Sequence, residues 1–164
     1  PVLAPFFKPK FYYQNEKAPK HLPKPSILVS NHVALADMPL YWTHYMFTNI
    51  RFLVAEVMFN KGGFMNWLLY KVGCIRVDRN HYDFSFIGDS LDCLDKGDVV
   101  GIYPSSRLPV DGIPFHFKPS VAIIAMHTNA PIIPIFIIYL VAITSISINA
   151  PFGRFATSTA LLAG

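Results

Sequence analysis

The sequence predicts an α/β fold, a single domain with a largely parallel central sheet flanked by helices, and three observations lead to that class. Short apolar segments of strand length alternate with segments of helical periodicity along most of the chain. The length of 164 residues suits one domain. Hydrophobic residues make up 52% of the chain and charged residues 15%, a balance that supplies a core and excludes a disordered protein.

The individual elements follow from local signals. Apolar, β-branched runs predict strands at 26–30, 51–56, 74–77, 98–103, 131–138 and 142–148. Helical spacing predicts helices at 38–48, 64–72, 83–96 and 120–128. Asp37 is placed to cap the first helix, and Gly73 and Gly97 to end the second and third. The third helix carries an apolar stripe of Phe84, Ile87, Leu91 and Leu94.

Three regions are expected along the chain: a basic, Pro-rich leader at 1–25, a domain at 26–152, and a C-terminal tail at 153–164 that could be truncated. The leader holds six prolines, which prevent a long helix, and five lysines against one acid. It is either a solvated segment or a contact for anionic lipid headgroups. A chain that starts at Pro1 and stops at Gly164 could also be a fragment.

The uncharged stretch between Lys118 and Arg154 is a candidate for a membrane span. Buried strands are the favoured interpretation, because Pro131 and Pro134 are tolerated at strand starts more easily than inside a helix.

Charge and cysteine content narrow the classes of function. A net charge of +4 suits phosphate or an anionic membrane better than a long nucleic acid. Cys74 and Cys93 cannot form a disulfide framework or a zinc site unaided, and both lie in apolar patterns. We therefore expect buried, reduced thiols in a reducing compartment, and no metal site.

The sharpest local feature is His32 followed five residues later by Asp37, between a predicted strand and a predicted helix. The two side chains would point about 140° apart on a continuous helix, so they can meet only if the chain turns between them. Asp37 could then accept a hydrogen bond from one imidazole nitrogen and leave the other as a general base. The alternative is a structural hydrogen bond without a catalytic role.

Two further segments could bind phosphate. Arg76 and Asp78 share one face of a predicted strand, and Arg79 follows. These arginines could grip a phosphate, or Arg76 and Asp78 could simply pair at a sheet edge. The loop after the strand at 98–103 offers Ser105, Ser106 and Arg107, where ligands bind in parallel sheets. It could equally be an ordinary connection.

At these three places, and at a fourth at 130–134, the chain resembles the glycerolipid acyltransferases of the lysophosphatidic acid acyltransferase type. The first family block, N-H-x4-D, is matched by Asn31, His32 and Asp37. The second, G-x-I-x-x-D-R, is matched from Gly73 to Arg79. The third, F-P-E-G-T-R, corresponds to the segment Y-P-S-S-R at 103–107, and the fourth, V-P-I-V-P, to the segment A-P-I-I-P at 130–134.

This resemblance implies a glycerol-3-phosphate acyltransferase-like fold and transfer of a fatty acyl group. The donor would be acyl-CoA or acyl carrier protein, with no cofactor, and the acceptor the free hydroxyl of a lysophospholipid, most readily lysophosphatidic acid. His32 would act as general base, oriented by Asp37. The chain would work at a membrane surface, on its cytoplasmic face, in phospholipid biosynthesis. The implied substrate-binding residues are Asn31, Arg76, Arg79, Ser105, Ser106 and Arg107.

The third block departs from the family, because Ser105 and Ser106 stand where the family has Glu and Gly. Arg107 also falls one place early. Two alternatives therefore stay open: an acyltransferase with a different acceptor, and a non-catalytic lipid-binding relative of the same fold.

Overall fold

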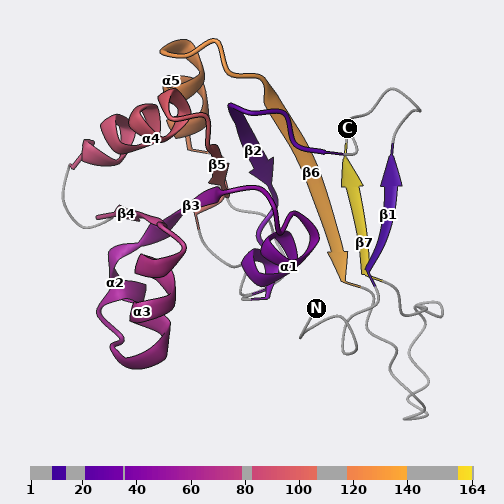
Figure 1. The fold of residues 1–164 in the computed structure, drawn as a ribbon, viewed down its shortest axis with the longest axis horizontal. Coiled ribbons are helices and arrows are strands. Elements are labelled where there is room, and N and C mark those ends of the chain that lie inside the picture. The colour runs from indigo at the N-terminus through magenta and orange to yellow at the C-terminus, as the bar shows by residue number, and fades with distance from the viewer. Residues whose placement is uncertain are drawn as a thin grey trace, which may run out of the picture.

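A computed structural model describes residues 9–13, 21–34, 36–78, 83–106, 118–139 and 159–163, with the backbone alone described at 9–13, 138–139 and 159–163. Its centre is a sheet with the strand order β1-β7-β6-β2-β5-β3-β4 (Figure 1). The strands are β1 (Pro9–Tyr13), β2 (Ser26–Ser30), β3 (Ile50–Ala55), β4 (Ile75–Val77), β5 (Val99–Ile102), β6 (Ile132–Tyr139) and β7 (Thr159–Ala163).

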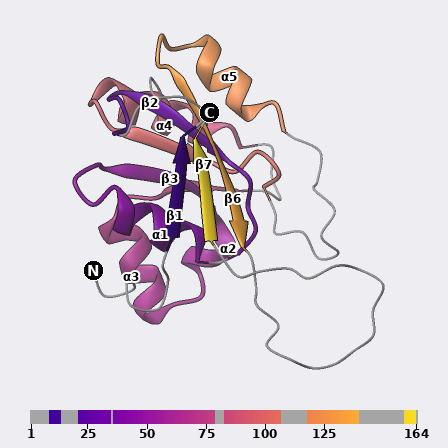
Figure 2. The ribbon, with the colours of Figure 1, turned by 90° about the vertical axis from the view of Figure 1, so that its right-hand side faces the viewer.

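Five of these strands form the parallel sheet that the sequence predicts. β2 pairs in parallel with β5 and β6, and β3 pairs in parallel with β5 and β4. β7 then joins β6 in antiparallel orientation, and β1 joins β7 in parallel. Figure 2, viewed from this side of the sheet, shows β6, β7 and β1 next to one another. The α/β class with a largely parallel sheet is thus confirmed.

Helices cover both faces of the sheet, as a parallel sheet requires. They are α1 (Asp37–His44), α2 (Glu56–Phe59), α3 (Gly63–Lys71), α4 (Ser85–Asp95) and α5 (Ser120–Met126). On one face α1, α2 and α3 bury Tyr41, Phe59 and Leu69 in a cluster with Leu28 and Phe52 of the strands. On the other face α4 and α5 bury another cluster, built from Ile27, Ile75, Leu94, Val100, Ile102 and Ile124.

Most predicted elements agree with these bounds, but the prediction for Phe84 was wrong. Phe84 does not belong to the buried stripe of α4, because the helix begins one residue later and Phe84 is 61% exposed. The carboxylate of Asp83 contacts the first residue of α4 instead, because it accepts hydrogen bonds of 2.8 Å from the amide and from the hydroxyl of Ser85. The short helix α2, which follows β3 without a loop, was not predicted.

Several predictions lie outside the described residues. These are the strand at 142–148 and the loop from 107 to 117. Within the described part of the chain, no helix is long and apolar enough to span a membrane. β1 falls in the predicted leader and β7 in the predicted tail, while the division into leader, domain and tail stays a prediction.

Candidate active site

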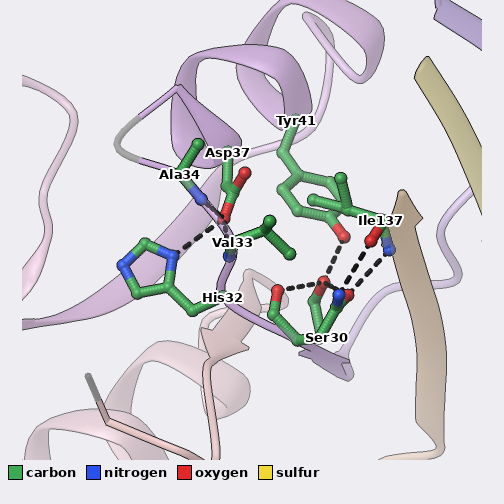
Figure 3. Close-up of polar contacts among 8 residues, drawn as sticks. Ser30, His32, Val33, Ala34, Asp37, Tyr41 and Ile137 are labelled. Carbon is green, nitrogen blue, oxygen red and sulfur yellow. Dashed lines mark hydrogen bonds and ion pairs between the residues drawn. The ribbon is translucent and has the colours of Figure 1, made fainter. Parts of the chain in front are cut away.

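The loop between β2 and α1 folds around the carboxylate of Asp37. Its Oδ2 atom accepts hydrogen bonds from the amides of Val33 at 2.8 Å and Ala34 at 3.0 Å, and lies 2.8 Å from Nδ1 of His32 (Figure 3). The side chain of Asp37 is fully buried. Asp37 therefore does not cap α1 as the sequence suggested: it is the first residue of the helix, and its carboxylate reaches back to close the loop.

This arrangement fixes the tautomer of His32. An Oδ2 atom that already accepts two backbone N–H groups acts as an acceptor, so Nδ1 of His32 donates to it. The lone pair of the imidazole is then on Nε2. Among the described residues no hydrogen bond to Nε2 is found, and the side chain of His32 is 16% exposed. One imidazole nitrogen is thus held by a buried carboxylate, an arrangement that a general base would require.

An aromatic stack supports one face of the imidazole. The ring of His32 lies on that of Tyr103 with centroids 4.3 Å apart and planes 17° apart. Tyr103 in turn lies on Phe52, with centroids 5.4 Å apart and planes 7° apart. Phe52 has room because its neighbour on β5 is Gly101, where a Cβ atom would collide with the phenyl ring. Three adjacent strands thus set the position of His32.

Asn31 ties the same loop to β6. Its Nδ2 donates to the carbonyl of Ile137 at 2.8 Å, and its Oδ1 accepts from the amide of Ile137 at 2.7 Å. The backbone pairing of β2 with β6 stops at Ser30, so the side chain of Asn31 continues the ladder one step further. Behind it, the hydroxyl of Tyr41 donates to Oγ of Ser30 at 2.7 Å. Burial raises the pKa of Tyr41, which keeps this phenol neutral.

The predicted phosphate-binding residues do not all meet at His32. Ser105 and Ser106 follow Tyr103 after one intervening proline, and the amide of Ser106 donates to the carbonyl of Tyr103 at 2.9 Å. Arg76 lies on β4, three strands from β2 and hence about 14 Å away at the usual strand spacing. Its guanidinium pairs with Glu56 at 3.2 Å. Arg79 and Arg107 lie outside the described residues.

Sequence reasoning missed Tyr103 as a site residue. It belongs to the third block, but no spacing rule connects it with His32, 71 positions earlier. The signal that could have found it is topological: β2 and β5 are adjacent parallel strands, so the residues that follow them meet at one edge. No group of three His, Cys, Asp or Glu side chains that could hold a metal ion occurs among the residues described.

The chain is thus an α/β protein in which a histidine, held by a buried carboxylate, follows a strand of the parallel sheet. The family model for Acyltransferase matches residues 10–138. The chain belongs to the acyltransferase family, and the family predicted from the sequence motifs is confirmed.

One solved structure reported as similar is the 1-acyl-sn-glycerophosphate acyltransferase PlsC from Thermotoga maritima. It matches with a TM-score of 0.66 at 18% sequence identity. The match covers 98% of this chain and 62% of the PlsC chain, so this chain spans less than two thirds of that protein. At this identity the match shows a shared fold. A search among curated proteins returned no match.

Proposed function

We propose that this protein transfers a fatty acyl group from a thioester donor to the free hydroxyl of a lysophospholipid. The observation that carries the proposal is the 2.8 Å contact between Nδ1 of His32 and Oδ2 of Asp37, in a member of the acyltransferase family. It supports a catalytic protein over a non-catalytic lipid-binding relative, because a binding protein has no need of an oriented base.

The proposed reaction needs only proton transfer and direct attack. Nε2 of His32 takes the proton of the acceptor hydroxyl, while the oxygen attacks the carbonyl carbon of the thioester. The tetrahedral intermediate collapses with cleavage of the carbon–sulfur bond, and the imidazolium returns the proton to the departing thiolate. Asp37 stabilises the imidazolium that forms in between. The products are the acylated lipid and a free thiol, and no cofactor is required beyond the donor itself.

The donor is proposed to be acyl-CoA or acyl carrier protein, and the first acceptor to test is lysophosphatidic acid. The altered third block favours one further candidate, an acyltransferase that uses a different acceptor. Ser105 stands where the family has Glu, so a carboxylate that could fix a neighbouring arginine or the acceptor is missing. The proposed phosphate-binding residues remain Arg76, Arg79 and Arg107, with Asn31, Ser105 and Ser106 shaping the site.

The test is release of free CoA from palmitoyl-CoA in the presence of a panel of lysolipids, with His32→Ala as control. Transfer to lysophosphatidic acid that is lost in His32→Ala would support the leading proposal. Transfer to another lysolipid alone would assign the altered acceptor. A folded protein without transfer to any acceptor, or one whose transfer survives His32→Ala, would overturn the proposed role of His32.

A further inference from the structure

The helical hairpin of α2 and α3 carries an apolar surface that the protein core does not use. The exposed fractions are 71% for Phe64, 61% for Tyr70 and 58% for Trp67, and Val57 of α2 is 62% exposed. Leu69 is the buried residue of α3. A helix that is apolar around most of its circumference is normally buried in a core or in lipid. We call these four exposed residues, together with the 41% exposed Met65, the hairpin face.

The charges around the hairpin face are basic. Lys61, in the turn before α3, and Lys71, at its end, are both exposed. Residues 56–71 contain one acidic side chain, Glu56, which is already paired with Arg76. Tryptophan and tyrosine settle at the boundary between water and hydrocarbon, and lysines beside them attract anionic headgroups. This combination fits the surface of an anionic bilayer better than a protein partner with an apolar groove.

The hairpin face also lies at the edge of the sheet that carries His32. β2 and β3 both run parallel to β5, so their carboxyl ends point the same way. His32 follows β2, while α2 begins at the residue after β3 (Figure 1). Tyr70 contacts Phe59 of α2, with ring centroids 5.2 Å apart, and both Phe59 and Leu69 lie in the core cluster, so the hairpin is fixed to the domain. A membrane bound there would present lysolipids on the side of the proposed base.

We propose that the hairpin face of α2 and α3 is a docking surface for an anionic lipid bilayer. The proposal deepens the proposed function, on which it rests for the identity of the lipid substrate, and binding itself can be measured without any transfer. Phe64 and Trp67, whose rings lie 5.7 Å apart, would insert into the headgroup boundary. Lys61 and Lys71 would contact phosphate groups.

The first experiment measures sedimentation of the protein with phosphatidylcholine vesicles with and without phosphatidylglycerol. Phe64→Ser/Trp67→Ser should lower the partition coefficient by at least about tenfold, since each side chain contributes a large apolar surface. The matched control is Phe47→Ser/Met126→Ser, which removes side chains that are 89% and 75% exposed and lie outside the hairpin. Equal losses in the two double variants, or no binding by the unchanged protein, would overturn the proposal.

Charge is tested separately with Lys61→Gln/Lys71→Gln. This variant should lose affinity for the anionic vesicles, by about fivefold for each lysine, and keep its binding to neutral vesicles. An equal loss on both kinds of vesicle would refute the electrostatic part of the proposal.

Depth of insertion is tested by fluorescence in the variant Trp42→Phe, which leaves Trp67 as the single tryptophan. We expect a blue shift on vesicle addition and quenching by brominated lipid. An unquenched Trp67 in vesicle-bound protein would show that another segment docks. A dimer that Phe64→Ser/Trp67→Ser converts to monomers, with vesicle binding unchanged, would assign the hairpin face to a second copy instead.

Failure of this proposal can be told apart from failure of the proposed function. Transfer to a short-chain lysolipid dissolved as monomers should not require the hairpin face. Phe64→Ser/Trp67→Ser should therefore keep that activity within about twofold. The same variant should lose activity on vesicles, because the lost apolar surface weakens its binding to the bilayer by at least about tenfold. Loss of both activities would contradict a docking role.

Discussion

Replacing Asp37 by Asn separates the charge of this side chain from its shape. The amide oxygen of Asn can still accept from the amides of Val33 and Ala34, so the loop between β2 and α1 should keep its fold. The negative charge beside His32 is lost. A hydrogen bond to a charged group contributes about 1.5–3 kcal/mol, so kcat should fall by about 10- to 100-fold. KM for the acceptor should change little, because the charge acts when the imidazolium forms.

The assay is release of CoA thiol, with the free energy of unfolding measured in parallel by denaturant titration. Asp37→Ala provides the contrast, because it leaves two amide donors of the loop without their acceptor and should cost about 2 kcal/mol of stability. If Asp37 acts through His32 alone, Asp37→Asn should have no further effect on the rate in a His32→Ala background. A kcat for Asp37→Asn within twofold of the unchanged protein, or fully additive losses, would refute the reasoning.

Three further outcomes are expected. Tyr103→Leu should lower kcat by about two- to tenfold by removing the ring under His32, while Tyr103→Phe should keep the rate, as steady-state assays can show. Ser106→Gly should raise the free energy of unfolding by up to about 1 kcal/mol, measured by denaturation, because Ser106 has φ 58°, which favours glycine. Desolvation raises the pKa of the Cys74 thiol from its ordinary value of 9.0 to about 12. Alkylation of Cys74 at pH 8 should therefore be slow in the folded protein and fast after unfolding. The free energy of unfolding should fall as the pH rises from 9.0 towards 12, because the unfolded protein loses this proton first. In the folded state, rapid alkylation of Cys74, which is partly buried, would contradict that desolvation.

The predictable parts of the fold are those set by local pattern. The run Ser26–Ser30 is a strand because it is short, apolar and bounded by turns, and the structure gives the same bounds. Gly73 was predicted to end a helix, and its φ of 70° agrees. The structure adds a second reason for that glycine: Nη1 of Arg51 donates to the carbonyl of Val72 at 2.7 Å, and a Cβ atom at Gly73 would collide with the guanidinium.

The parts that could not be predicted depend on contacts between distant segments. The ion pair between Arg51 and Asp98, at 2.9 Å, joins β3 to the start of β5, and no local sequence pattern predicts it. The stack of His32 on Tyr103 likewise requires the strand order, which periodicity does not specify. Asp37 shows a different limit. Its position at a helix start predicted a cap, but in the structure its carboxylate accepts hydrogen bonds from the loop before the helix. The same bonds are what orient His32.

The candidate site divides into residues fixed to the strands next to β2 and residues proposed to contact the lipid headgroup. Asn31 fastens the loop of His32 to β6 through both atoms of its amide, and Tyr103 fixes the imidazole from β5. Both constraints come from strands adjacent to β2, so the base and its carboxylate have little freedom to adapt. The proposed headgroup contacts, in contrast, come from the end of β4 and from the segment after β5. Under the proposed function, we therefore expect Ser105 and Ser106 in that segment to affect the choice of acceptor more than the position of His32.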